Sequence, residues 1–467
     1  MKEREALHLG YQPPLGGGSR WDWWSTPIPA EVQCLIDADT PPETVLKLDI
    51  TGSANFTSFP TSMGRLSSLH ALELFDFQEL AALPDSFGDL TSLKTLNIAN
   101  CPNITAIPDS VRRLSSLTFI SLFCCSGFTE LPLTRGDLPA LEKFSINCCL
   151  GLTALPGSIG ELPSLIVLSV VNCPELTALP ASLGDSPALK TLIVNSCDQL
   201  TDLPESLGFI STLEALELIK CRGLTRLPDS VALLSKLGRL MVKDCRSIST
   251  LPTSLGHLSS LTKLSICSCE SLTGLPDSVG LLSSLTYLLL LKCPSITALP
   301  DSLGELSALE TFILDDCSNL ATLPRTLNGL CNLWNLDIQN CKGLSELPDS
   351  LGYLPSLQHL DITRCEGLVE LPSCLGELSS LNTLTISDCP NLAWLPDSIG
   401  DLSSLESLVL RNCSCLEELP YSMRELFSLK HLLVETPLTF ICLDDLCALP
   451  NLISLRVCLF PGPSSKR

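Results

Sequence analysis

The chain has 467 residues, of which 45% are hydrophobic and 17% charged, and its formal net charge is −22. So acidic a protein offers no net basic footprint for neutralising phosphates, and we expect no nucleic-acid partner. Its longest apolar run, around Leu288–Leu291, is far shorter than the roughly 20 residues that cross a bilayer, so we expect no membrane span.

The first 44 residues differ from the rest of the chain because they mix charge, Pro, Gly and Trp without a repeat. They contain no apolar core followed by a small-residue cleavage site, so we expect no secretory signal and a cytoplasmic, or also nuclear, location. Trp21, Trp23 and Trp24 either cap the end of the array that follows or dock a partner. The stretch Ile28–Asp37 is expected to form a short helix over the first strand.

From Val45 onward the sequence repeats every 24 residues. Sixteen prolines follow this period from Pro60 to Pro420, with no insertion or deletion between them. The unit reads LxxLxIxxCxxLTxLPxSLGxLSS, as in residues 381–404. A period of about 20–29 residues with this leucine spacing is typical of leucine-rich repeats. We therefore predict an α/β leucine-rich-repeat solenoid, a horseshoe with a concave parallel sheet and short helical or 3-10 turns on its convex face.

This pattern divides the chain into three parts: an arm and cap over residues 1–44, a solenoid over residues 45–451, and an incomplete capping repeat over residues 452–467. The solenoid holds sixteen units of 24 residues and one of 23. Within a unit, LxxLxI predicts a strand, and the proline is expected at the first position of a helical turn. Acidic residues recur directly after the proline and four positions later. We expect both columns near the start of that turn, where carboxylates cap free amides.

Fourteen of the 24 cysteines occupy one column of the repeat, from Cys101 to Cys413. The side chain turns inward there, so we predict buried, reduced thiols that pack as small hydrophobic groups. Neighbouring strands lie about 4.8 Å apart, which leaves disulfides possible, but a uniform column gives no pairing rule. Cys124 and Cys148 are expected to point outward, and an exposed link between them is an alternative. No four ligands converge as tetrahedral zinc requires, so we expect neither a metal nor a cofactor.

No catalytic set of residues is apparent. The five histidines are scattered, with no Cys, Asp or Glu cluster at metal-ligand spacing. Gly16–Gly18 follow no predicted strand, so a linker is favoured over a phosphate-binding loop. We therefore expect that the protein is not an enzyme, with a redox or metal-handling role for the cysteines as an alternative.

The motif CxxLTxLPxSLGxLSSL resembles the repeats of plant nucleotide-binding leucine-rich-repeat disease-resistance proteins and, more loosely, those of plant Ras-group-related repeat proteins. The resemblance extends over about residues 45–460. It implies protein recognition, autoinhibition or scaffolding in plant immune or defence signalling. The GxxxxGK[ST] loop of the receptors is absent, which suggests a stand-alone sensor or scaffold, or a truncated relative. Residues 28–36 are similar to the start of an F-box, so a substrate-recruiting adaptor of a ubiquitin ligase is an alternative.

Outward strand positions in the middle turns combine large apolar side chains with positive charge. Adjacent turns make them contiguous, and such a surface is typical of an interaction site. We name these residues the central patch and predict that they bind a protein partner. They are Ile219, Lys220, Arg239, Met241, Lys243, Lys263, Tyr287, Leu289, Leu291, Lys292 and Ile313. The next turns become acidic at Asp315, Asp337 and Asp361. Because single exposed apolar residues are common, an ordinary solvated face is the alternative.

Overall fold

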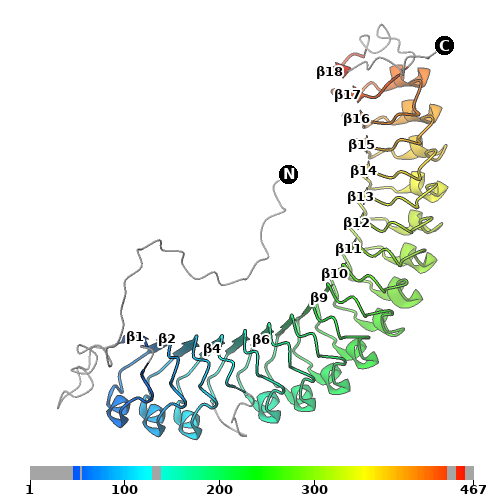
Figure 1. Cartoon of the computed structure of the whole chain (residues 1–467). Helices are drawn as coiled ribbons and strands as arrows, with labels where there is room; N and C mark the ends of the chain where they lie inside the picture. Colours follow the sequence, from blue (N-terminus) through cyan, green and yellow to red (C-terminus); the bar gives the residue numbers. More distant parts are fainter. Residues whose placement is uncertain (1–45, 53–54, 129–137, 439–448, 458–467) are drawn as a thin grey trace, which may run out of the picture.

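The structure is a computed structural model that describes residues 46–52, 55–128, 138–438 and 449–457. These residues follow an arc, with strands along its inner side and short helical turns along its outer side (Figure 1). The predicted N-terminal arm, its helix and its tryptophan cluster lie outside the described residues, as does most of the predicted C-terminal capping repeat.

In these described ranges, eighteen strands form one open sheet in which each strand pairs in parallel with the next strand along the chain. They are β1 (Lys47–Thr51), β2 (Ala71–Phe75), β3 (Thr95–Ala99), β4 (Phe119–Phe123), β5 (Lys143–Asn147), β6 (Val167–Val171), β7 (Thr191–Asn195), β8 (Ala215–Ile219), β9 (Arg239–Lys243), β10 (Lys263–Cys267), β11 (Tyr287–Leu291), β12 (Thr311–Asp315), β13 (Asn335–Gln339), β14 (His359–Thr363), β15 (Thr383–Ser387), β16 (Ser407–Arg411), β17 (His431–Glu435) and β18 (Ser454–Val457). Lys47 lies opposite Ala71, one repeat further on, which is the register that an uninterrupted repeat produces.

Each strand alternates between the core and the concave surface because successive side chains of a strand point to opposite faces. In β11, Leu288 and Leu290 are fully buried, whereas the residues on either side of them are partly exposed. Leu288 lies in register with Leu264 of β10 and Phe312 of β12, which are also buried. The core is therefore a set of continuous columns along the solenoid.

The convex side carries fifteen 3-10 helices, and no α-helix occurs in the described residues. They are η1 (Thr61–Arg65), η2 (Asp85–Asp89), η3 (Asp109–Arg113), η4 (Gly157–Glu161), η5 (Ala181–Asp185), η6 (Glu205–Phe209), η7 (Asp229–Leu233), η8 (Leu255–His257), η9 (Asp277–Leu281), η10 (Asp301–Glu305), η11 (Leu327–Gly329), η12 (Asp349–Tyr353), η13 (Leu375–Glu377), η14 (Asp397–Asp401) and η15 (Tyr421–Glu425). The predicted concave parallel sheet and short convex turns are both confirmed.

Two details of these turns differ from the sequence predictions. The proline precedes the turn: Pro84 is the N-cap of η2 with φ −72° and ψ 154°, and its carbonyl oxygen accepts the hydrogen bond of Phe87 N at 3.0 Å. The second acidic column lies at the end of the turn, as at Asp89, because a five-residue 3-10 helix is complete by that position. Carboxylates of the first column can reach the next turn instead, since Asp301 Oδ1 accepts a hydrogen bond from Arg325 N at 3.1 Å.

The glycine of SLG is required by close packing of neighbouring turns. A Cβ atom at Gly160 would lie 1.9 Å from the carbonyl oxygen of Ser182, one turn further on. At Gly280 the corresponding distance, to the carbonyl oxygen of Ser302, is 2.3 Å. A side chain at either position would force the turns apart, so this column preserves the stacking of the convex side.

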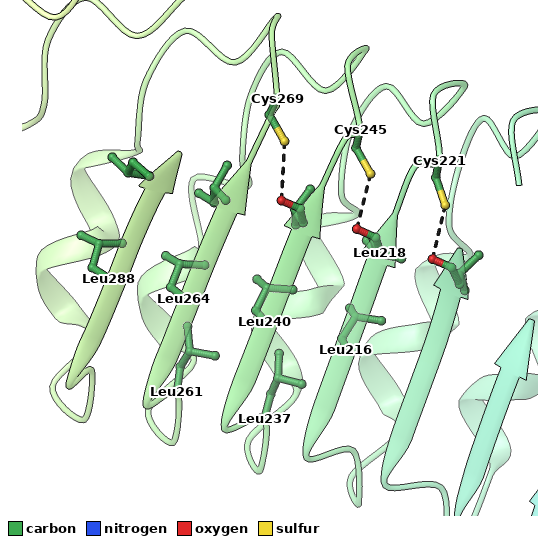
Figure 2. Close-up of a cluster of buried hydrophobic side chains, with 14 of the residues drawn as sticks. Leu216, Leu218, Cys221, Leu237, Leu240, Cys245, Leu261, Leu264, Cys269 and Leu288 are labelled. Carbon is green, nitrogen blue, oxygen red and sulfur yellow. Dashed lines mark hydrogen bonds between the residues drawn. The ribbon is translucent and has the colours of Figure 1, made fainter. Parts of the chain in front are cut away.

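The fourteen column cysteines are all buried, as predicted. Their thiols also hydrogen-bond to the backbone, which the sequence analysis did not foresee. Cys221, Cys245 and Cys269 donate to the carbonyl oxygens of Val194, Leu218 and Val242 at 3.5, 3.6 and 3.7 Å, as Figure 2 shows. Each acceptor lies in the strand of the previous turn: Val194 in β7, Leu218 in β8 and Val242 in β9. The column therefore links successive turns.

Candidate protein-binding surface

The structure places all eleven residues of the central patch on or beside β8 to β12. Nine occupy outward strand positions, and the other two, Lys220 and Lys292, directly follow β8 and β11. The strands are consecutive in the sheet, so residues that are 24 positions apart in sequence become neighbours. The patch is therefore contiguous on the concave face.

The middle of the patch is formed by two small residues that the sequence analysis left out. Ser265 lies in register between Met241 and Leu289, and Cys267 lies between Lys243 and Leu291. Both are outward-facing yet only 8% and 5% exposed, because their longer neighbours cover them. The apolar part of the patch is consequently carried by β9 and β11, with a low strip along β10 between them.

Positive charge in the patch comes mainly from its four lysines. Arg239 is different because its Nη2 lies 3.2 Å from Oε1 of Glu217, an outward residue of β8. Within the described part of the chain, no carboxylate lies within ion-pair distance of the four lysines. The sequence could have indicated that Glu217 faces the patch, because this residue occupies the middle outward position of its strand. The patch therefore presents lysines that are available to a partner and one arginine that is already paired.

The face becomes acidic immediately beyond the patch. Asp315 accepts a hydrogen bond from Asn340 Nδ2 at 2.8 Å, and Asp337 accepts one from Gln339 Nε2 at 3.0 Å. Burial raises the pKa of Asp361 above its usual value, although a hydrogen bond from the Thr363 hydroxyl opposes the shift. The concave surface thus changes sign between β11 and β13.

A row of left-handed residues borders the strands at their carboxyl ends. The backbone φ is 52° at Lys220 and 54° at Lys292, and equivalent residues of most turns share this conformation. Their amides extend the ladder, since Lys220 N donates to Lys243 O and Lys292 N donates to Asp315 O, both at 2.7 Å. Asn and Asp, which tolerate this conformation, recur in the column, and this recurrence could have indicated the left-handed row from the sequence. The row holds two patch lysines at the rim of the sheet.

A second exposed apolar row lies on the convex side of the same turns. Phe209, Leu233 and Leu281, the last residues of η6, η7 and η9, are 66%, 57% and 54% exposed. His257 ends η8 between them. In many other turns the last residue of the 3-10 helix is acidic. The change from acidic to apolar residues at this position could therefore have indicated the row from the sequence.

Metal clusters of three or more ligands and membrane-spanning helices have no counterpart in the residues that the structure describes. No three or more His, Cys, Asp or Glu side chains are grouped there so that they could hold a metal. No helix in those ranges is long and apolar enough to cross a membrane.

Comparison with known proteins agrees with this architecture. Residues 335–434 match a family described as a leucine-rich repeat region. A leucine-rich-repeat protein of Leptospira interrogans is 24% identical over 91% of this chain and 97% of its own, with a TM-score of 0.58. The fold is that of a leucine-rich-repeat solenoid. A chain of the Drosophila Toll–Spätzle complex has a TM-score of 0.63 at 17% identity, over 83% of this chain and 53% of that one. Among curated proteins, no match was found.

In this leucine-rich-repeat solenoid, the buried columns maintain the stack and the outward strand positions are free of that requirement. The central patch is built from these outward positions and from two residues that follow strands. Its composition is therefore not explained by the needs of the fold.

Proposed function

We propose that this solenoid is a non-enzymatic recognition module or scaffold that binds a protein partner through the central patch. The observation that carries the proposal is the combination of partly exposed Met241, Tyr287 and Leu289 with four lysines that lack ion-pair partners among the described residues. On a protein with a net charge of −22, a concentration of unpaired positive charge beside apolar side chains favours binding over simple solvation.

The chemistry of the patch suggests how a partner is held. An apolar group seated over β9 to β11 would cover Tyr287 and Leu289, which are the kind of large side chains that supply most binding energy at interfaces. The lysines around them would attract an acidic rim on the partner and mainly increase the association rate. Burial raises the pKa of Tyr287, with the Cys267 thiol and the Asp337 carboxylate adding to the shift, so its hydroxyl remains a neutral hydrogen-bond donor at physiological pH.

We further propose that the protein acts in the cytoplasm in plant immune or defence signalling. The support is the CxxLTxLPxSLG motif, which resembles the repeats of plant disease-resistance proteins.

Affinity capture with the full chain tests the proposal. The double variant Tyr287→Ala with Leu289→Asp should lose its partner, because removal of a central anchor costs about 2 kcal/mol or more. Val409→Asp is the matched control, since Val409 is a partly exposed outward residue of β16, away from the patch. If the double variant keeps its partners while removal of residues 1–44 loses them, the proposal is wrong and the N-terminal arm is the docking element.

A further inference from the structure

Three side chains in successive turns form a polar row beside the ends of β4, β5 and β6. Cys124, Cys148 and Asn172 each follow a strand directly, with left-handed φ values of 52°, 56° and 51°. Cys124 and Cys148 directly follow Phe123 and Asn147, which lie in register on β4 and β5, so the two cysteines are neighbours one turn apart. The Nδ2 atom of Asn172 donates to Sγ of Cys148 at 3.0 Å. The repeat thus brings two sulfurs together and adds an amide donor on one side.

This pair differs from the other cysteines because both of its residues are partly exposed. The column cysteines are buried, and Cys331 and Cys415 are exposed at places whose described counterparts one turn away are not cysteine. In the described ranges, Cys124 and Cys148 are the one pair of adjacent cysteines that are both partly exposed. A ligand could therefore reach two sulfurs at once at this place.

We propose that Cys124 and Cys148 form a two-thiolate site for a soft monovalent cation of the Cu(I) type. Thiolate sulfur is the ligand that such ions prefer. On binding, each thiol releases its proton to solvent and each sulfur donates one electron pair to the cation, which leaves a complex of charge −1. The Asn172 amide would hold Cys148 Sγ in place, in the way that outer hydrogen bonds orient metal ligands.

The spacing of the strands lets one ion bridge the two sulfurs. Equivalent residues of parallel neighbours lie about 4.8 Å apart, and two metal–sulfur bonds of about 2.3 Å span up to about 4.6 Å. The same spacing is within reach of a direct disulfide, which the experiment below distinguishes from a bound ion. Zinc would require further ligands, and no group of three or more His, Cys, Asp or Glu side chains lies around these sulfurs in the described residues.

Anaerobic titration of the full reduced chain with Cu(I), against a chromogenic Cu(I) chelator, tests the proposal. The native protein should retain one more equivalent than C124S, and C148S should lose the same whole equivalent, because the site needs both sulfurs. The double variant C331S/C415S removes two exposed single thiols and should retain that equivalent. Asn172→Ala should bind about 10–100-fold more weakly, with an unchanged circular dichroism spectrum.

Several results would overturn the two-sulfur site. If C124S and C148S each keep the extra equivalent, or if C331S/C415S loses it, the ion is bound elsewhere. If oxidised glutathione converts Cys124 and Cys148 into an intramolecular disulfide, found by peptide mapping, while the reduced chain retains no extra equivalent of Cu(I), the two cysteines are a redox pair and the proposal is wrong.

Discussion

Replacing Cys245 by aspartate is predicted to destabilise the central turns by about 3–5 kcal/mol. Cys245 is fully buried, and its thiol donates to the carbonyl oxygens of Leu218 and Lys243 at 3.6 and 3.5 Å. A carboxylate at this place would face two acceptors and have no donor. An unpaired buried charge costs several kcal/mol, and about 3–5 kcal/mol is typical when a buried charge is left without its partner.

Hydrogen exchange in peptides that cover β8 to β10 measures this loss locally, which is appropriate because a long repeat array need not unfold in a single step. Protection should fall roughly 10²- to 10⁴-fold, since each 1.4 kcal/mol corresponds to a factor of ten. Cys331→Asp is the matched control: Cys331 is exposed, and a change of about 0.5 kcal/mol or less is expected. Equal loss of protection in the two variants would refute the buried column.

Three further predictions concern the whole solenoid. Burial raises the pKa of Cys293 to about 11 and of Cys269 to about 12 from 9.0, so the unfolded chain loses these protons at lower pH than the folded chain does. The melting temperature should therefore stay constant below pH 9 and fall as the pH rises toward 11–12. A melting temperature that does not change over this range would contradict the burial of these thiols. Arg364→Gly should stabilise the protein by about 0.5–1 kcal/mol in urea unfolding because φ is 57° there, and Arg364→Val should destabilise it. Deleting residues 240–263, one whole unit, should leave the flanking turns protected from hydrogen exchange, whereas deleting four residues of that unit should not, since turns contact mainly their neighbours.

Much of the fold followed from the sequence because the repeat is free of insertions. The proline period fixed the unit length, and the leucine spacing predicted which strand residues are buried, as at Leu288 and Leu290. Cys124 and Cys148 do lie outside the core, as predicted, but for another reason: alternation from the buried Leu122 would turn Cys124 inward, and the left-handed backbone after the strand turns it out. A period of 24 residues specifies the neighbours of every residue, so local patterns became contacts between turns.

Other features depend on geometry that the pattern does not contain. The proline was placed inside the helical turn, although at Pro84 an extended ψ puts it just before the turn. The pairing of Arg239 with Glu217 needs the side-chain directions of two adjacent strands. The burial of Ser265 arises from the size of its neighbours, which a column of outward residues does not reveal. For the central patch, the sequence gives the residues and their shared face, while binding itself stays a prediction.

Lysine footprinting of the solenoid with its captured partner tests the central claim most directly. Acylation of the four patch lysines, Lys220, Lys243, Lys263 and Lys292, should fall when the partner is bound. Lys47, Lys236 and Lys342 are exposed outside the patch and should react as before. Protection of Lys342 or Lys47 with no change at the patch lysines would contradict recognition by the central patch.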